Sequence, residues 1–152
     1  MKKISSIFTY FNKKIFPALW FGFLGVFVLI SLPPMISKGE VDIMFIVAPI
    51  VLAVFGYFIM KALVFDLVDE AWDDGDSLVF KNKGKEERIS LSNILNINYV
   101  VVSNPPRVTL TLREPCGFGK EVTFSPQFGV IPFKKSPLIT DLIERVDNAR
   151  KS

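Results

Sequence analysis

The sequence has no histidine and a single cysteine. Without histidine the chain lacks the usual general base, the usual activator of a nucleophile and the commonest metal ligand. Cys116 has no imidazole to activate it and no second cysteine with which to form an intramolecular disulfide. No glycine-rich phosphate-binding loop is present either. We therefore expect no catalytic residue, no metal and no cofactor, in a protein that is not an enzyme.

An excess of charge of one sign is also lacking. The sequence holds 18 Lys and Arg against 15 Asp and Glu, which gives a net charge of +3 at pH 7. Nucleic-acid-binding domains carry a large basic patch or stripe, and this balance does not supply one. A nucleic-acid partner is therefore not expected.

Charge is missing altogether from two long stretches. Ile15 to Ser37 contains 23 residues and Ile43 to Met60 contains 18, all of them uncharged. A helix that crosses about 30 Å of hydrocarbon needs about 20 apolar residues, and Lys61 can extend the second stretch because its ammonium group reaches the interface. The sequence thus predicts a transmembrane helical hairpin over residues 16–64, with Pro33-Pro34 ending the first helix. The following "SLPPMIS" offers no signal-peptide cleavage site, so this helix is expected to be retained.

Lysines lie mostly on one side of this hairpin. Lys38 alone is in the link, whereas the other nearby lysines precede the first stretch (Lys2, Lys3, Lys13, Lys14) or follow the second (Lys61, Lys81, Lys83, Lys85). Lysine and arginine favour the cytoplasmic side of a membrane. We therefore expect a multi-pass membrane protein with both termini in the cytoplasm.

Apolar residues also recur at three- and four-residue steps before the first uncharged stretch. They are Ile4, Ile7, Phe8, Phe11 and Ile15, and lysines flank them at both ends. This spacing is typical of an amphipathic helix that lies in the membrane interface. We expect residues 1–15 to form such a segment; the alternative is a simple extension of the first membrane span.

From residue 65 the pattern becomes an alternation of apolar and polar residues. Val108, Leu110 and Leu112 show the period of two that marks a strand with one buried face. Five other short stretches are also read as strands: 67–72, 78–80, 89–91, 97–101 and 122–124. Apolar residues between Leu138 and Val146 have helical spacing instead, after Ser136 as N-cap and Pro137 as first helical residue. Residues 65–152 therefore predict a small antiparallel β sandwich or barrel closed by an amphipathic C-terminal helix.

A cluster of acidic residues, Asp73-Asp74-Gly75-Asp76, separates the first two of these strands. In a calcium loop of the EF-hand type, Gly75 at position 6 would place Trp72 and Lys81 at two ligand positions, and neither side chain can serve there. Asp-Gly between apolar strands is instead a strong hairpin signal, because glycine readily adopts a positive φ. We therefore interpret this segment as a β-turn and not as a metal site.

The stretch "DSLVFKNKGKEERISLSNILNINY", above all "RISLSNILNI", resembles membrane-anchored bacterial PH-like domains. The resemblance covers roughly residues 65–150. It implies a curved sheet of about seven strands closed by the C-terminal helix, used for binding and located at a bacterial inner (cytoplasmic) membrane. Phosphoinositide-binding PH domains have a basic first hairpin turn, whereas the acidic turn here would repel an inositol phosphate.

The sequence therefore predicts a docking or scaffold module for the lipid surface or for a membrane-protein partner, which includes a second copy of the chain. The alternative is an accessory subunit of a larger membrane complex, held by its helical hairpin. A first strand starting near residue 65 would carry the acidic turn roughly 20 Å away from the bilayer, and the next strand would return lysines toward it. The candidate residues for contact with the membrane surface are Lys2, Lys3, Lys13, Lys14, Lys81, Lys83, Lys85, Arg107, Phe128, Phe133, Lys134 and Lys135; the alternative is that these belong to ordinary solvated loops.

Overall fold

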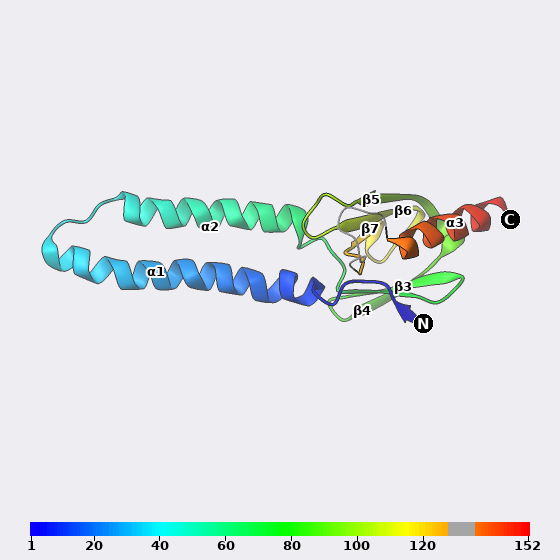
Figure 1. The fold of residues 1–152 in the computed structure, drawn as a ribbon, viewed down its shortest axis with the longest axis horizontal. Coiled ribbons are helices and arrows are strands. Elements are labelled where there is room, and N and C mark those ends of the chain that lie inside the picture. Colours follow the sequence, from blue (N-terminus) through cyan, green and yellow to red (C-terminus); the bar gives the residue numbers. More distant parts are fainter. Residues whose placement is uncertain (128–135) are drawn as a thin grey trace. The chain divides into compact units, whose positions relative to one another are not determined.

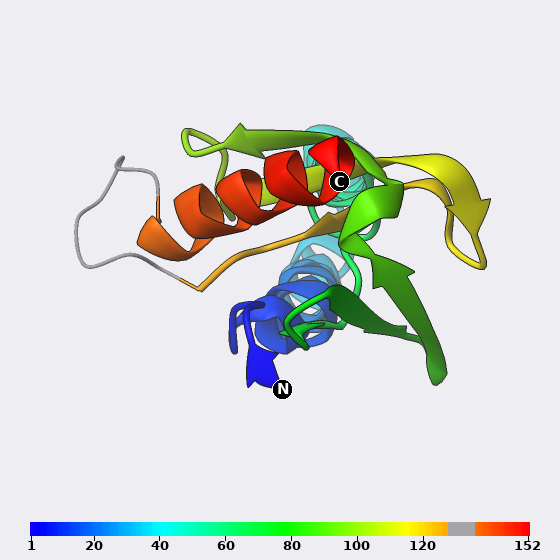
Figure 2. The same cartoon turned by 90° about the vertical axis from the view of Figure 1, so that its right-hand side faces the viewer.

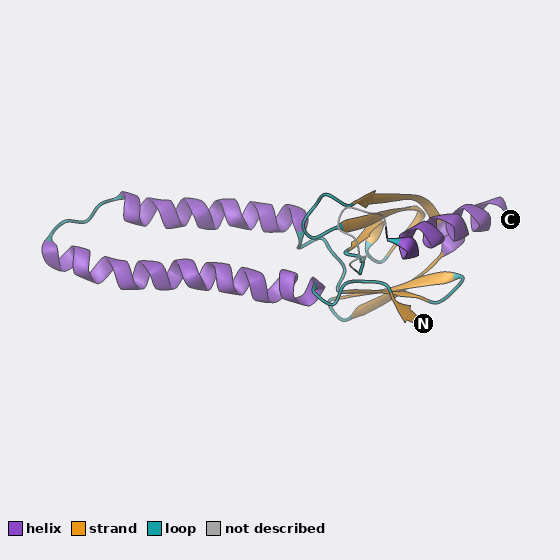
Figure 3. Cartoon of the chain, in the orientation of Figure 1, coloured by secondary structure: helices purple, strands orange, loops and turns teal. Residues whose placement is uncertain are grey.

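The chain forms two compact units in the computed structural model. The helical unit is Phe11–Phe65, and the β unit combines Met1–Tyr10 with Asp66–Ser152. The structure describes residues 1–127 and 136–152. Figures 1 and 3 show the elements along the chain. The β unit is therefore built from two segments that lie on either side of the helical unit in the sequence.

The helical unit consists of a π-helical turn η1 (Phe11–Ile15) and two helices, α1 (Phe16–Lys38) and α2 (Met44–Leu63). Both helices are long and apolar enough to cross a membrane, which confirms the two helices predicted from the uncharged stretches. Only 11% of the most apolar 18-residue window of each helix is buried, whereas the core helix of a soluble protein is mostly buried.

The sequence predicted that the first helix ends at its proline pair, and this prediction is wrong. Helix α1 continues through Pro33 and Pro34 to Lys38, and Gly39 caps it with φ = +69°. The N–H of Gly39 donates to the carbonyl of Ile36. Gly39 therefore ends the helix, because glycine adopts a left-handed conformation more easily than other residues. The two prolines do not end it, since an apolar helix of this kind can accommodate proline.

A glycine lets the two helices approach each other. A Cβ atom on Gly56 would lie 2.6 Å from Nε1 of Trp20, which is closer than two such atoms can come. Farther along the pair, the rings of Phe27 and Phe45 stack with their centroids 6.3 Å apart. Gly56 therefore has the helix-packing role that small residues commonly have between apolar helices.

The β unit contains two antiparallel sheets and a C-terminal helix. The first sheet has the order β1 (Lys2–Lys3), β2 (Glu70–Asp73), β3 (Ser77–Asn82), β4 (Lys85–Ser90). The second has the order β5 (Ile94–Val100), β6 (Arg107–Cys116), β7 (Gly119–Phe124). A short 3₁₀ turn η2 (Leu91–Asn93) joins the sheets, and α3 (Pro137–Lys151) follows. All six predicted strands and the final helix are confirmed, but the two sheets do not form a closed barrel.

Strand β1, which the sequence did not predict, comes from the start of the chain. Lys2 and Lys3 pair with Asp73 and Trp72 of β2. The next residue, Ile4, is fully buried, and its N–H donates to the carbonyl of Ala71 at 2.9 Å. The prediction of one interfacial helix over residues 1–15 is therefore wrong for these first residues, which belong to a sheet and to its core.

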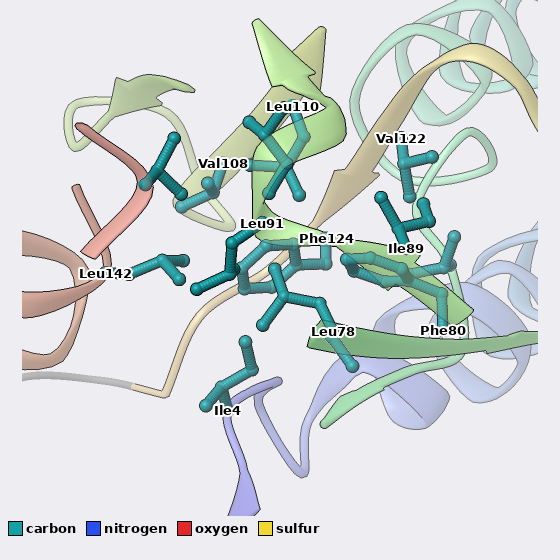
Figure 4. Close-up of a cluster of buried hydrophobic side chains, with 14 of the residues drawn as sticks. Ile4, Leu78, Phe80, Ile89, Leu91, Val108, Leu110, Val122, Phe124 and Leu142 are labelled. Atoms are coloured by element: carbon teal, nitrogen blue, oxygen red, sulfur yellow. The ribbon is translucent and has the colours of Figure 1, made fainter. Parts of the chain in front are cut away.

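Alternating strands and the helical stripe meet in one hydrophobic core. Figure 4 shows Ile4 and Leu142 pointing toward the cluster that contains Leu78 and Phe80. The rings of Phe80 and Phe124, one from each sheet, lie 5.9 Å apart. The buried residues of α3 are those of the predicted stripe: Ile139, Leu142 and Val146. Helix α3 therefore covers the core with the apolar face that the spacing of its residues predicted.

Ile4 and Ile7 offer a matched pair for testing the role of the N-terminal segment. Ile4→Ala should lower the free energy of unfolding of the β unit by about 2–5 kcal/mol, because it leaves a cavity in the core. Ile7 is 72% exposed, so Ile7→Ala should change this free energy by less than about 0.5 kcal/mol. Urea unfolding of the full chain in detergent measures both, with Trp72 fluorescence as the reporter in a Trp20→Phe background. Equal effects of the two substitutions would contradict the buried position of Ile4.

Candidate functional site

The acidic turn, Asp73–Asp76, is the hairpin between β2 and β3. Asp73 pairs with Leu78, and the N–H of Asp74 donates to the carbonyl of Ser77 at 3.0 Å. Gly75 has φ = +85°, a conformation that favours glycine. The hairpin interpretation of this segment is confirmed.

An arginine from the C-terminal helix clasps this turn. Arg145 forms an ion pair with Asp73, and its Nη1 also donates to Asp73 Oδ1 at 3.1 Å and to the carbonyl of Gly75 at 2.9 Å. Its Nε donates to Asp141 at 3.0 Å. Arg88 of β4 forms a second ion pair, with Asp74. The acidic cluster therefore serves to attach α3 and β4 to the hairpin.

These contacts change the acidity of both partners. Burial acts to raise the pKa of Asp73, but the hydrogen bonds from Arg145 and from the N–H of Gly75 outweigh it and hold the pKa below its ordinary value. The hydrogen bond to Asp73 raises the pKa of Arg145. The pair is therefore ionised throughout the neutral range, with two-point geometry that lysine could not reproduce.

A shallow cleft of about 450 Å³ lies beside this turn, lined in part by Asp76, Ser90, Ser92 and Asn148. The hydroxyl groups of Ser90 and Ser92 are 2.9 Å apart and bond to each other. In the described part of the chain neither hydroxyl group bonds to a carboxylate or an amine. The cleft combines these hydroxyl groups with the charged side chains of Asp76 and Arg145.

The opposite end of the β unit carries both of its connections to the helical unit, and we call it the joining end. The chain leaves the β unit after Tyr10 and re-enters it at Asp66. Asp66 forms an ion pair with Arg107, the first residue of β6. Nearby, the N–H of Ser6 donates to the carbonyl of Ser125 at 2.8 Å. The two connections thus lie at one end, where β6 begins and β7 has ended.

Apolar side chains are exposed at the joining end. Ile7 and Phe8 precede the first connection and line a hollow of about 350 Å³ with Ser6 and Gln127. Tyr10 is 61% exposed, and Val102, in the loop between β5 and β6, is 83% exposed.

Four of the predicted membrane-contact residues lie near the joining end, and acidic residues lie beside some of them. The four are Lys81, Lys83, Lys85 and Arg107. Lys81 pairs with Glu86 at 3.2 Å, Arg107 pairs with Asp66, and the backbone N–H of Lys83 donates to Asp69 at 2.7 Å. Lys85 lies in the same hairpin, opposite Asn82. The basic field expected from the sequence is therefore weaker than predicted, and the exposed apolar residues Tyr10 and Val102 were missed.

The other predicted residues lie elsewhere. Lys2 and Lys3 are on β1 beside the acidic-turn end of β2, where Lys3 bonds to Glu70 at 2.7 Å and lies 5.6 Å from the centre of the Trp72 ring. Lys13 and Lys14 belong to η1 of the helical unit. Four residues fall outside the part that the structure describes: Phe128, Phe133, Lys134 and Lys135.

Metal-binding and thiol chemistry find little support in the described residues. Within residues 1–127 and 136–152, no three His, Cys, Asp or Glu side chains are grouped so that they could hold a metal ion. Cys116 is the last residue of β6 and is half-buried against the core, so it is not the residue of an exposed turn. Its sulfur accepts a hydrogen bond from the N–H of Phe118 at 3.4 Å.

Acid should weaken the β unit through Asp73. Because folding lowers the pKa of this carboxyl below its ordinary value of 3.8, its stabilising contribution is complete above that value and is lost as the pH falls through the folded pKa. Glu70, whose pKa the Lys3 contact lowers from 4.5, acts in the same direction. Urea unfolding of the full chain between pH 7 and pH 3 should show a constant stability at first and a decline below about pH 4.5.

Arg145→Ala should flatten this decline, because Asp73 then keeps the burial that raises its pKa and loses the hydrogen bonds that lower it. Arg150→Ala is the matched control, since Arg150 lies on the same helix and makes an exposed pair with Asp147. Identical acid profiles for Arg145→Ala and the unmodified chain would exclude the clasp as the source of the effect.

Comparison of the chain with protein-family models, curated proteins and solved structures finds no match in any of the three. The function must therefore be argued from the chain's own residues, and the PH-like resemblance stays a prediction.

Proposed function

We propose that this protein is a membrane-anchored, non-catalytic docking protein. Its two apolar helices span the membrane, and its β unit rests with the joining end on the cytoplasmic surface of the bilayer. The acidic-turn end and the sheet edges then face the cytosol, where a partner can reach them. The lack of histidine supports the non-catalytic assignment.

The observation that carries this proposal is the position of the two chain connections. Tyr10 and Asp66 are both at the joining end, so the residues that continue into two membrane-spanning helices leave the β unit on one side. That same side exposes Ile7, Phe8 and Val102. A bilayer below the joining end would cover these side chains without any rearrangement of the sheets.

Apolar contact should contribute more than charge to this docking. Fully burying a side chain such as Phe or Ile contributes about 1.5–3 kcal/mol, whereas a lysine near an anionic membrane contributes about 1 kcal/mol. The positive charges of Lys81 and Arg107 are, in addition, paired within the protein. The contact is therefore expected to depend only weakly on salt and on anionic lipid, in contrast to the basic surface that the sequence first suggested.

The lysine distribution supports a cytoplasmic location of both termini. After Ser152, a reporter that is active only in the cytoplasm should be active. Between Lys38 and Asp42, a reporter that is active only outside the cytoplasm should be active. The two fusions serve as controls for each other. An externally active fusion at Ser152 would contradict the proposed topology.

The membrane contact can be tested with fluorescent labels on single cysteines in a Cys116→Ser background. Labels at Phe8→Cys and Val102→Cys should be quenched by lipids that carry a nitroxide on a shallow acyl carbon, because the joining end dips into the interface. A label at Asp76→Cys, in the acidic turn, is the matched exposed control and should remain bright. Phosphatidylcholine vesicles with and without phosphatidylglycerol should give similar quenching.

Equal quenching at positions 8 and 76 would contradict the proposed orientation of the β unit. Absence of quenching at all three positions would reject membrane docking and favour a subunit held by its helical hairpin alone.

A further inference from the structure

The two open sheets leave outer strands whose backbone groups face away from the sheet. The sheet orders place β1 and β4 at the edges of the first sheet and β5 and β7 at the edges of the second. An unprotected edge strand pairs readily with another extended chain, so proteins shield such edges with charge, short length or a covering segment. The four edges of this protein can be compared on that basis.

Three of the edges carry one of these protections. Strand β4 reads KEERIS, and its first four residues are all charged. Strand β1 is only two residues long. Strand β7 is partly covered, because the N–H of Val68 donates to the carbonyl of Thr123 at 2.8 Å and Leu67 forms a bridge with the same residue.

Strand β5 is neither charged nor short, and no other described segment pairs with its outer side, although a β-bulge between Ile94 and Asn96 interrupts its start. It reads ILNINYV, seven residues without charge, proline or glycine, and is about 23 Å long at 3.3 Å per residue. Within residues 1–127 and 136–152, β6 is the only strand that pairs with it. Leu95 and Val100 are exposed along it. In Figure 2 it runs along the outer rim of its sheet, above α3.

We propose that the free edge of β5 is the docking site for an extended segment of a partner protein, which adds to the sheet as a further strand. This proposal rests on the docking function proposed above and names the partner's chemistry. Unpaired backbone N–H and C=O groups in a row are satisfied by another extended backbone and by few other ligands. The occupant is therefore a polypeptide strand.

The side chains of β5 indicate what kind of strand fits. Its residues read the same from either end by chemical type: two apolar, one amide, one apolar, one amide, two apolar. An antiparallel strand of that composition, centred on Ile97, would place Asn96 opposite an amide and Leu95 opposite an apolar residue. Facing amides can hydrogen-bond to each other and facing apolar side chains bury surface, whereas a charged strand would find no counter-charge on β5. The partner segment is therefore uncharged, with amide and apolar residues alternating.

A second copy of this chain in the same membrane is a more restricted occupant than a segment of another protein. Strand β5 runs from η2 toward Arg107, which places its C-terminal end at the joining end. Two copies in one membrane keep the component of β5 along the membrane normal in the same direction, so they could pair antiparallel only with β5 lying in the membrane plane. A segment of a different protein can pair with β5 at any orientation of the β unit.

The test uses the full chain in detergent and a fluorescent peptide of sequence ILNINYV with a lysine tail for solubility. Two further peptides carry N-methyl groups on alternate backbone nitrogens, one in each phase. In strand addition only one edge of the peptide bonds to β5. One methylated peptide should therefore bind about a hundredfold more weakly, through the loss of about three hydrogen bonds, while the other binds as the parent does.

A protein variant gives an independent readout. Asn98→Lys places a charge on the free edge and should weaken binding about tenfold. Glu121→Lys, at an exposed position of the edge strand β7, is the matched control and should leave binding unchanged. Addition of the parent peptide should protect from hydrogen exchange those β5 amides that do not bond to β6.

Equal binding of the two methylated peptides, or no binding of the parent peptide, would overturn the proposal. Protection, in the peptide-free chain, of the β5 amides that do not bond to β6 would also overturn it, because the edge would then already be covered. The assay does not require a bilayer, so its failure would leave the lipid-quenching result, and with it the membrane-docking function, unaffected.

Discussion

The β unit depends on the burial of Ile4, a residue that the chain contributes before it enters the helical unit. Ile4 is fully buried, its backbone bonds to Ala71, and the carbonyl of Ile4 accepts from the N–H of Gln127. These contacts tie the first residues of the chain to β2 and to the segment that follows β7. The helical unit is thus an insertion within the β unit, and this constraint brings both connections to one end.

Charge in the β unit is arranged mainly to hold its elements together. Asp73 and Asp74 are matched by arginines from α3 and β4, and Asp66 is matched by the arginine that begins β6. Each pair joins elements that are distant in sequence. Because these charges are compensated within the protein, the acidic turn and the start of β6 have weaker fields than the order of charges along the sequence suggests. The proposed docking therefore relies on apolar exposure and on backbone groups at a sheet edge.

Sequence patterns predicted the parts of the fold in which burial follows a period. The uncharged stretches predicted α1 and α2, and alternation such as that of Val108, Leu110 and Leu112 predicted the strands, since these patterns reflect which face of an element is buried. Strand β1 could not be found in this way. Two lysines give no strand signal, and their pairing with Asp73 and Trp72 is created by tertiary contact. Ile4, Ile7 and Phe8 gave a false helical period because Ile4 belongs to the core whereas the other two are exposed.

The candidate sites were harder to predict for the same reason. Lysines and arginines can be counted in a sequence, but their partners Glu86 and Asp66 are assigned only by the fold. The acidic turn was recognised as a hairpin because Asp-Gly is a local signal, whereas its clasp by Arg145 joins residues 72 positions apart. An unprotected edge depends on the order of strands in a sheet, which no local pattern supplies.

The division of the β unit by the helical unit also imposes an order on biosynthesis. During translation, β1 emerges first and β2 only after the 55 residues of Phe11–Phe65 have been made. The first ten residues therefore stay unpaired with β2 until the two apolar helices have been synthesised. Once those helices pair, they hold the ends of the intervening segment close together, which lowers the entropy cost of bringing β1 to β2. Insertion of the hairpin would in this way act as an assembly step for the domain outside it, and a fragment that begins at Asp66 would lack both the first strand and Ile4.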